Sequence, residues 1–277
     1  MKFTKMHGLG NDYIYINGFI ESLEDPSETA IRLSDRHFGI GGDGIVLILP
    51  SKTCDFRMRM FNNDGSEAEM CGNASRCVAK YVHDYKLTDK EEITLETLAG
   101  VKILKMQLKD GKVSTVTVNM GPPILSPKDI PTLYDGDTVV DRDLDVAGEN
   151  YKVTCVSMGN PHAITFVEDV ENYPIQEIGP KIENHPMFPK RINAEFAKVL
   201  NRNTIQMRVY ERGTGETLAC GTGACATLVA AVLNDKTDRQ ATLKLLGGDL
   251  QIHWSEEDNN VYMTGPATTV FDGEVEL

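Results

Sequence analysis

The sequence lacks three features that would assign it to large classes of protein: clustered positive charge, a long apolar segment and a known metal-binding spacing. Its 277 residues carry a formal net charge of −13. This argues against nucleic acid or an anionic membrane as the main partner, because clustered Lys and Arg bind phosphate groups. Apolar runs such as IVLIL at 45–49 are far shorter than the roughly 20 residues that span a bilayer. The N-terminal stretch MKFTKMHGLGNDYIYI also lacks the apolar core of a signal peptide. We therefore expect a cytoplasmic protein that binds neither nucleic acid nor membrane.

Cysteine is present, but not in the patterns of disulfide-rich or zinc-binding proteins. The six cysteines include no C-x-x-C pair, and the spacing of Cys and His matches no common zinc site. Because thiols stay reduced in the cytoplasm, we expect these cysteines to be core residues or reactive groups. We expect no metal site.

The sequence repeats itself at an offset of 149 residues, the distance from Cys71 to Cys220. Residues 57–77, RMRMFNNDGSEAEMCGNASRC, align without a gap with residues 206–226, QMRVYERGTGETLACGTGACA. The same offset aligns Gly10-Asn11 with Gly159-Asn160. We interpret the chain as two homologous halves.

Local patterns predict the same strand, turn and helix in both halves. Apolar residues alternate with polar ones over 56–60 and 205–209, as in half-buried strands. A Gly-rich turn follows each strand, and then a helix, which is apolar on one face after Cys71 and almost all round after Cys220. Short strands dominate elsewhere, so we expect a strand-rich shell around one central helix in each half. The Pro-rich stretch 121–136 is the expected junction.

Cys71 and Cys220 each precede a glycine at the predicted start of a helix. The unpaired N–H groups there stabilise a thiolate or bind a carboxylate. Two such thiols facing one carboxylate-bearing carbon could invert it, one removing its proton and the other supplying a proton to the opposite face. The other four cysteines are expected to be small core residues: Cys54, Cys77, Cys155 and Cys225.

Motifs along the whole chain resemble those of the diaminopimelate epimerases, isomerases that interconvert LL- and meso-diaminopimelate without pyridoxal phosphate. They are MHGLGNDYIYI, MRMFNNDGSEAEMCGN, GNPH, RINAEF, YERGTGETLACGTGACA and MTGPA. The resemblance implies an α/β (α+β) fold of two domains related by duplication, each a mostly antiparallel β-barrel-like sheet around a central helix. The implied domains are 1–119 with 265–277, and 120–264, with the active site in the cleft between them. It also implies a homodimer without cofactor, in lysine and peptidoglycan precursor biosynthesis.

The resemblance further implies a role for each residue that matches a family motif. Cys71 and Cys220 match the catalytic cysteines, which exchange acid and base roles with the direction of the reaction. His162 and Glu211 match residues important for activity. The implied substrate-binding residues are Asn11, Asn62, Gly72, Asn73, Asn160, Asn193, Glu211, Arg212, Gly221 and Thr222.

The two halves differ where Asn62-Asn63 of the first align with Glu211-Arg212 of the second. We interpret the residues that both halves share as those that act on the carbon that is inverted. The unshared pair would then bind a distal ammonium and carboxylate, with Arg212 on the carboxylate. A substrate with two amino-acid ends fits this difference.

The sequence departs from the family pattern at three places. Ala74-Ser75 stand where Gly-Ala is usual, and Gly44 stands where some members carry a substrate-contacting glutamine. Phe271 replaces a tyrosine that supports the dimer interface in some members.

Two other functions are compatible with parts of the pattern. A proline or hydroxyproline racemase would share the fold but typically carries Cys-Gly-His at the first site, where this chain has Cys71-Gly72-Asn73. A thiol redox protein could use a disulfide between Cys71 and Cys220, but it would leave the distal Glu211-Arg212 pair unexplained.

Overall fold

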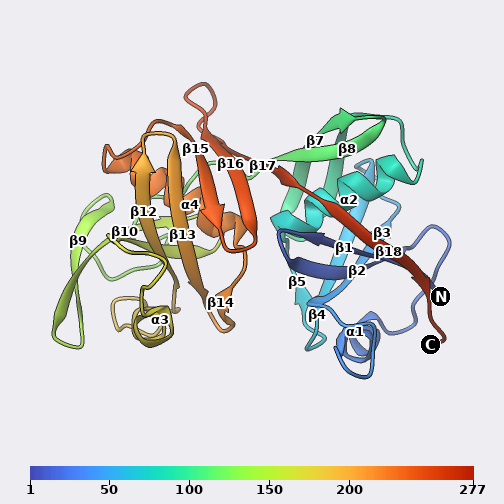
Figure 1. The fold of residues 1–277 in the computed structure, drawn as a ribbon, viewed down its shortest axis with the longest axis horizontal. Coiled ribbons are helices and arrows are strands. Elements are labelled where there is room, and N and C mark those ends of the chain that lie inside the picture. Colours follow the sequence, from blue (N-terminus) through green and yellow to red (C-terminus); the bar gives the residue numbers. More distant parts are fainter. The chain divides into compact units, whose positions relative to one another are not determined.

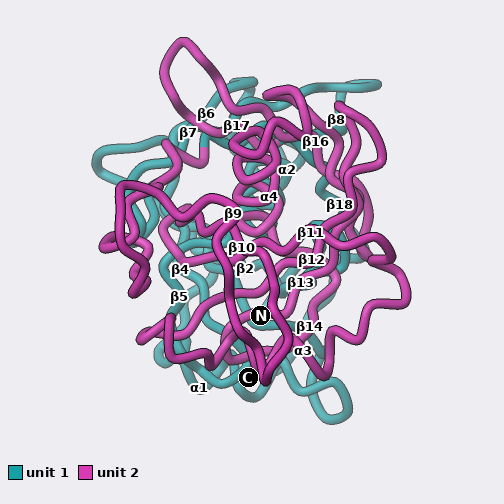
Figure 2. Tube along the Cα trace, turned by 90° about the vertical axis from the view of Figure 1, so that its left-hand side faces the viewer, with its two compact units in different colours: residues 1–119, 264–277 teal, residues 120–263 magenta.

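The chain folds into two compact units that both mix helices and strands, so the predicted α/β class is confirmed. A computed structural model describes residues 1–277, and Figure 2 colours its two units. One unit comprises residues 1–119 and 264–277, and the other comprises residues 120–263. The Pro-rich stretch 121–136 therefore belongs to the second unit. No helix has the length and apolar character needed to cross a membrane.

The first unit is a mostly antiparallel sheet with two helices. β18 pairs with β1, β1 with β2, β3 with β4, β6 with β7 and β7 with β8 antiparallel, whereas β2–β3 and β4–β6 are parallel. The elements are β1 (Lys2–Gly8), β2 (Asn11–Asn17), α1 (Pro26–Ser34), β3 (Gly44–Leu49), β4 (Phe56–Asn62), β5 (Glu67–Ala68), α2 (Gly72–Asp84), β6 (Glu92–Thr97), β7 (Gly100–Lys109), β8 (Lys112–Asn119) and β18 (Thr268–Glu274). The strand before β18, β17 (Val261–Pro266), crosses the boundary between the units.

The second unit repeats this order of pairings. β9–β10, β10–β11, β12–β13 and β15–β16 are antiparallel, and β11–β12 and β13–β15 are parallel. The elements are β9 (Val139–Val146), β10 (Glu149–Ser157), β11 (Pro161–Phe166), α3 (Ile175–Glu183), β12 (Asn193–Asn201), β13 (Thr204–Glu211), β14 (Gly215–Thr217), α4 (Gly221–Leu233), β15 (Gln240–Leu245) and β16 (Gly248–Trp254).

The repeat found in the sequence extends through the fold. Adding 149 to the bounds of α1 and α2 gives the bounds of α3 and α4. The parallel pair β2–β3 corresponds to β11–β12, and β4–β6 corresponds to β13–β15. The predicted duplication therefore agrees with the topology of both units.

Each unit has one central helix that packs on several strands (Figure 1). α2 lies against β1, β2, β7 and β8, and α4 lies against β10–β13, β15 and β16. As predicted, α4 is buried almost all round. The prediction of a single apolar face on α2 was too narrow, because the polar residues Asn73, Ser75 and Arg76 at its start are also buried.

Candidate active site

The predicted residues fall into two groups, one in each unit. In the first unit, Cys71 is the N-cap of α2, with extended backbone angles of φ −136° and ψ 122°. Its carbonyl oxygen accepts the Ser75 N–H at 2.9 Å, which begins the helix. The Cys71 thiol, which is partly exposed, donates to Oδ1 of Asn11 at 3.3 Å. The start of α2 therefore carries a thiol that is partly exposed to solvent.

A charged network fixes the Asn11 amide. Asn11 is the first residue of β2 and follows a tight turn in which Gly10 has a φ of 85°. Its Nδ2 group donates to Oδ2 of Asp43 at 2.8 Å, and Asp43 pairs with Arg36 at 3.0 Å. With its NH2 group held by a carboxylate, Asn11 presents its oxygen to Cys71.

Two further predicted residues of the first unit lie close to the helix start or to β3. Asn73 is buried, and its Oδ1 accepts from Nη2 of Arg76 at 2.8 Å. Asn62, at the end of β4, donates to Ser66 Oγ at 3.1 Å and lies opposite Gly44 in the sheet. A Cβ on Gly44 would lie 2.0 Å from the Phe61 carbonyl oxygen, so the backbone here excludes the glutamine that some family members carry.

In the second unit, Cys220 is the N-cap of α4, but it is more deeply buried than Cys71. Cys220 is 5% exposed, and its Sγ accepts the Gly223 N–H at 3.4 Å. Burial, together with the carboxylates of Glu211 and Glu195, raises the pKa of the Cys220 thiol well above its usual range. The expectation that the helix start alone lowers this pKa was wrong, because desolvation penalises the thiolate more than the helix N–H groups stabilise it.

In the second unit, His162 lies between Asn160 and the carboxylate of Glu195, and its two ring nitrogens contact one side chain each. His162 and Glu195 are both fully buried, and His162 Nδ1 lies 2.6 Å from Glu195 Oε1. His162 Nε2 lies 3.0 Å from Oδ1 of Asn160, which is partly exposed. Burial raises the pKa of Glu195, and the nearby His162 opposes that shift.

The remaining predicted residues follow the end of β13. Thr217 Oγ1 donates to Glu211 Oε1, and the Arg212 guanidinium, which is exposed, donates to the Lys190 carbonyl at 3.0 Å. The buried Asn193 side chain accepts the Arg212 N–H at 2.8 Å and donates to the Pro161 carbonyl at 2.8 Å. Asn193 therefore holds the Glu211-Arg212 segment beside the strand that carries His162.

Two buried charged residues near the cysteines were not predicted from the sequence. Arg76 is fully buried in α2 and donates to the Gly72 and Pro266 carbonyls as well as to Asn73. Glu195 is fully buried in β12. The repeat contained a signal for both, since Arg76 aligns with Cys225 and Glu195 aligns with Val46. Where one unit buries a charged residue and the other unit buries a small or apolar residue at the aligned position, the shared fold does not require the charge. Such a charge is therefore a candidate for a functional role.

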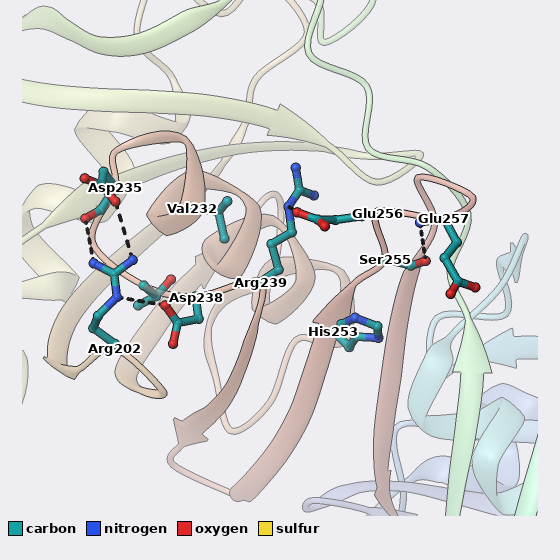
Figure 3. Close-up of a pocket in the computed structure, with 10 residues that line it drawn as sticks. Arg202, Val232, Asp235, Asp238, Arg239, His253, Ser255, Glu256 and Glu257 are labelled. Atoms are coloured by element: carbon teal, nitrogen blue, oxygen red, sulfur yellow. Dashed lines mark hydrogen bonds and ion pairs between the residues drawn. The ribbon is translucent and has the colours of Figure 1, made fainter.

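Figure 3 shows a surface pocket in the second unit. Its charged side chains pair with one another, Arg202 with Asp235 and Asp238, and Arg239 with Glu256. None of the predicted site residues lines this pocket. No group of three or more His, Cys, Asp or Glu side chains is arranged to hold a metal ion.

Known structures share this fold at low sequence identity. A probable proline racemase from Agrobacterium radiobacter aligns with a TM-score of 0.71 at 16% identity, covering 100% of this chain and 93% of that one. A phenazine biosynthesis protein of the PhzF family from Enterococcus faecalis aligns with a TM-score of 0.72 at 14% identity, covering 100% of this chain and 99% of that one. These similarities establish the fold.

Sequence relatives are much more similar. The family model described as diaminopimelate epimerase matches residues 3–126 and 154–270. A diaminopimelate epimerase from Acetivibrio thermocellus is 62% identical over 277 residues, covering 100% of this chain and 99% of the relative. One from Methanococcus maripaludis is 59% identical over the full length of both chains. The resemblance noted in the motifs is therefore confirmed, and the chain belongs to the diaminopimelate epimerase family.

Proposed function

We propose that this chain is an isomerase that interconverts LL- and meso-diaminopimelate, with Cys71 and Cys220 as the two acid–base groups and no cofactor. The observation that carries the proposal is the presence of a cysteine as N-cap of the central helix in both units. Neither cysteine is joined in a disulfide. Family membership supports the identity of the substrate, and the paired thiols support the two-base mechanism.

In the proposed reaction, one cysteine acts as a thiolate and removes the α-proton of the substrate. The electron pair left on carbon is delocalised into the α-carboxylate, whose developing charge is stabilised by the N–H groups of the helix starts. The other cysteine, as a thiol, donates its proton to the opposite face of the carbon, which inverts the centre. The two cysteines exchange roles when the reaction runs in reverse.

This proposal requires both helix starts to act on one substrate, in a cleft between residues 1–119 with 265–277 and residues 120–264. Gly72, Asn73, Gly221 and Thr222 would supply the groups that hold the reacting carboxylate. Glu211 and Arg212 would bind the distal ammonium and carboxylate, with the bidentate guanidinium on the carboxylate. Asn11, Asn62, Asn160 and Asn193 would complete the binding site.

Isotope exchange tests the proposal. Reduced protein is incubated with LL-diaminopimelate in D2O, without cofactor or metal, and α-deuteration is followed by NMR and stereochemistry by chiral chromatography. We expect inversion with deuterium at one centre. Cys71→Ala and Cys220→Ala should each lower the rate by about 10²–10⁴-fold or more, whereas Cys54→Ala, a control away from both helix starts, should not.

No exchange with folded, reduced wild-type protein would contradict the proposed function. Proline and hydroxyproline would then be tested as substrates in the same assay. If neither is racemised and a reversible Cys71–Cys220 disulfide forms under mild oxidation, the redox function would be favoured.

We also infer that the active form is a cytoplasmic homodimer that serves lysine and peptidoglycan precursor synthesis. Support for the dimer comes from β18, where Val270 is 53% exposed and Phe271 is 47% exposed. The Phe271 ring packs edge-on against Phe3, at 5.9 Å between centroids, which holds it in place at the surface. Light scattering should give a dimer for the wild type and a monomer for Phe271→Asp, with Leu98→Asp, at another exposed apolar site, as the control.

A further inference from the structure

The buried pair of His162 and Glu195 contacts a predicted substrate-binding residue, Asn160, through His162. Both members of the pair are fully buried. Oε1 of Glu195 contacts His162 at 2.6 Å, and Oε2 of Glu195 is buried without a hydrogen-bond partner. Because burying a carboxylate with an unsatisfied oxygen is costly, this arrangement calls for an explanation other than stability.

The first unit shows that the fold does not need these residues. At the aligned positions it carries Tyr13 for His162 and Val46 for Glu195, and both are buried in the same pair of parallel strands. It also carries Ala74 where the second unit has Gly223. A Cβ on Gly223 would lie 2.8 Å from Glu195 Oε1, so the glycine makes room for the carboxylate. The second unit therefore differs from the first at three positions that contact one another, His162, Glu195 and Gly223.

Charge balance assigns the protons of the pair. If Glu195 were ionised and His162 neutral, a net negative charge would lie on two fully buried side chains, close to Glu211 and Cys220. A single proton shared between Glu195 Oε1 and His162 Nδ1, with a second proton on Nε2, leaves the pair neutral. Nε2–H then donates to Oδ1 of Asn160, which matches the side-chain orientation in the structure.

The two homologous asparagines are consequently held in opposite orientations. In the first unit, Asp43 takes the NH2 group of Asn11, and the oxygen faces Cys71. In the second unit, His162 donates to the side-chain oxygen of Asn160, so the Asn160 NH2 group can donate to a ligand. Asn160 is partly exposed, so this donor is within reach of a substrate.

We propose that Glu195 is a positioning residue that, through His162, holds Asn160 with its NH2 group toward the substrate, as a hydrogen-bond donor to a carboxylate oxygen. The proposal rests on the proposed function for the identity of the substrate. Glu195 itself touches no substrate atom. It acts by fixing which nitrogen of His162 carries the proton that orients the amide.

The protonation of His162 can be measured without substrate. Protein labelled with 15N at histidine has six imidazoles, and the His162 signals are assigned by their loss in His162→Gln. We expect Nε2 of His162 to carry a proton at neutral pH. A neutral ring protonated only at Nδ1 would overturn the proposal, because Nε2 could then only accept from the Asn160 NH2 group. This result is independent of whether diaminopimelate is the substrate.

Kinetics test the consequence for binding. Glu195→Leu removes the shared proton while keeping a side chain of similar size, so the amide is no longer fixed and KM for diaminopimelate should rise by about 10- to 100-fold, with a smaller change in kcat. Glu195→Gln can donate an N–H to Nδ1 and keep the same tautomer, so it should restore KM to within a few-fold of the wild type. A merely structural role would not produce this division between KM and kcat with rescue by Gln.

A double variant tests whether Glu195 acts through Asn160. In the background of Asn160→Ala, adding Glu195→Leu should have little further effect on KM, since the group to be positioned is gone. Losses that multiply in the double variant would overturn the proposal, as would a Glu195→Gln enzyme as impaired as Glu195→Leu. If the wild type itself does not turn over diaminopimelate, the proposed function fails, and the NMR result still decides the positioning of the amide.

Discussion

Gly223→Ala is expected to destabilise the protein, although alanine is the better helix former. Gly223 lies in the first turn of α4, where alanine would ordinarily stabilise the fold by up to about 1 kcal/mol. The added Cβ would lie 2.8 Å from Glu195 Oε1 and 3.3 Å from Cys220 Sγ. Glu195 cannot retreat without lengthening its 2.6 Å contact with His162. Overpacking of this kind costs about 1–3 kcal/mol, so we expect a net loss of about 0–2 kcal/mol.

The first unit supplies the matched controls for this prediction. It carries Ala74 and Val46 at the positions aligned with Gly223 and Glu195. Ala74→Gly should therefore cost about 1 kcal/mol from helix propensity, with no steric relief. In the background of Glu195→Val the obstructing oxygen is absent, and Gly223→Ala should become neutral or stabilising by up to about 1 kcal/mol.

A double-mutant cycle measures the interaction. Urea unfolding of the wild type, Gly223→Ala, Glu195→Val and the double variant gives the four free energies, with the m values compared to verify that the unfolding process is the same. We expect the two changes to couple by about 1–3 kcal/mol. Additivity within about 0.5 kcal/mol, or stabilisation of the wild type by Gly223→Ala, would refute the steric relation between Gly223 and Glu195.

Three further predictions concern the cysteines and the buried arginine. Burial raises the pKa of Cys77 from 9.0 to about 11, so the unfolded chain ionises first as pH rises. The folded state then holds the extra proton, and the free energy of unfolding should fall by about 1.4 kcal/mol per pH unit between about pH 9 and 11. Urea titrations of Cys77→Val should lack this contribution, and an unchanged slope would count against it. Iodoacetamide at pH 8 should label the partly exposed Cys71 faster than Cys220, whose burial and raised pKa suppress the thiolate; peptide mass spectrometry showing the reverse order would contradict this. Arg76→Met should destabilise the protein by about 2–4 kcal/mol in urea unfolding, because it removes the hydrogen bonds that the buried guanidinium donates to Asn73 and to the Pro266 carbonyl. Arg57→Met, at a side chain 41% exposed, should change stability by no more than about 0.5 kcal/mol.

The elements of the fold could be predicted because they depend on local patterns that the repeat reinforces. The alternation of apolar residues at 56–60 and 205–209 corresponds to β4 and β13. The Cys-Gly pairs mark the N-caps of α2 and α4. Both are short-range signals, in which the side chain and the backbone conformation are related through one or two turns of chain.

The electrostatic properties of the site could not be predicted, because they depend on which residues become buried together. The helix start favours a thiolate at Cys220, but the burial of that side chain and the proximity of Glu195 arise from packing between β12 and α4. The same holds for Arg76, which the helical pattern alone would place on a polar face. In both cases a long-range contact outweighs the local preference.

The duplication separates what the fold requires from what the chemistry requires. Both units keep an arginine–glutamate pair beside the turn before the helix, Arg59–Glu67 and Arg208–Glu216, at the same 2.7 Å. Both keep the Gly-Asn turn and the Cys-Gly helix start. The units differ in the buried polar groups that contact these shared segments. The first unit has the cationic Arg76, and the second has the His162–Glu195 pair. A reaction that inverts one carbon needs equivalent groups on its two faces, while a substrate with a second, distal end needs the two sides of the site to differ. In the proposed reaction, shared thiols with unshared supporting charges would satisfy both requirements in one chain.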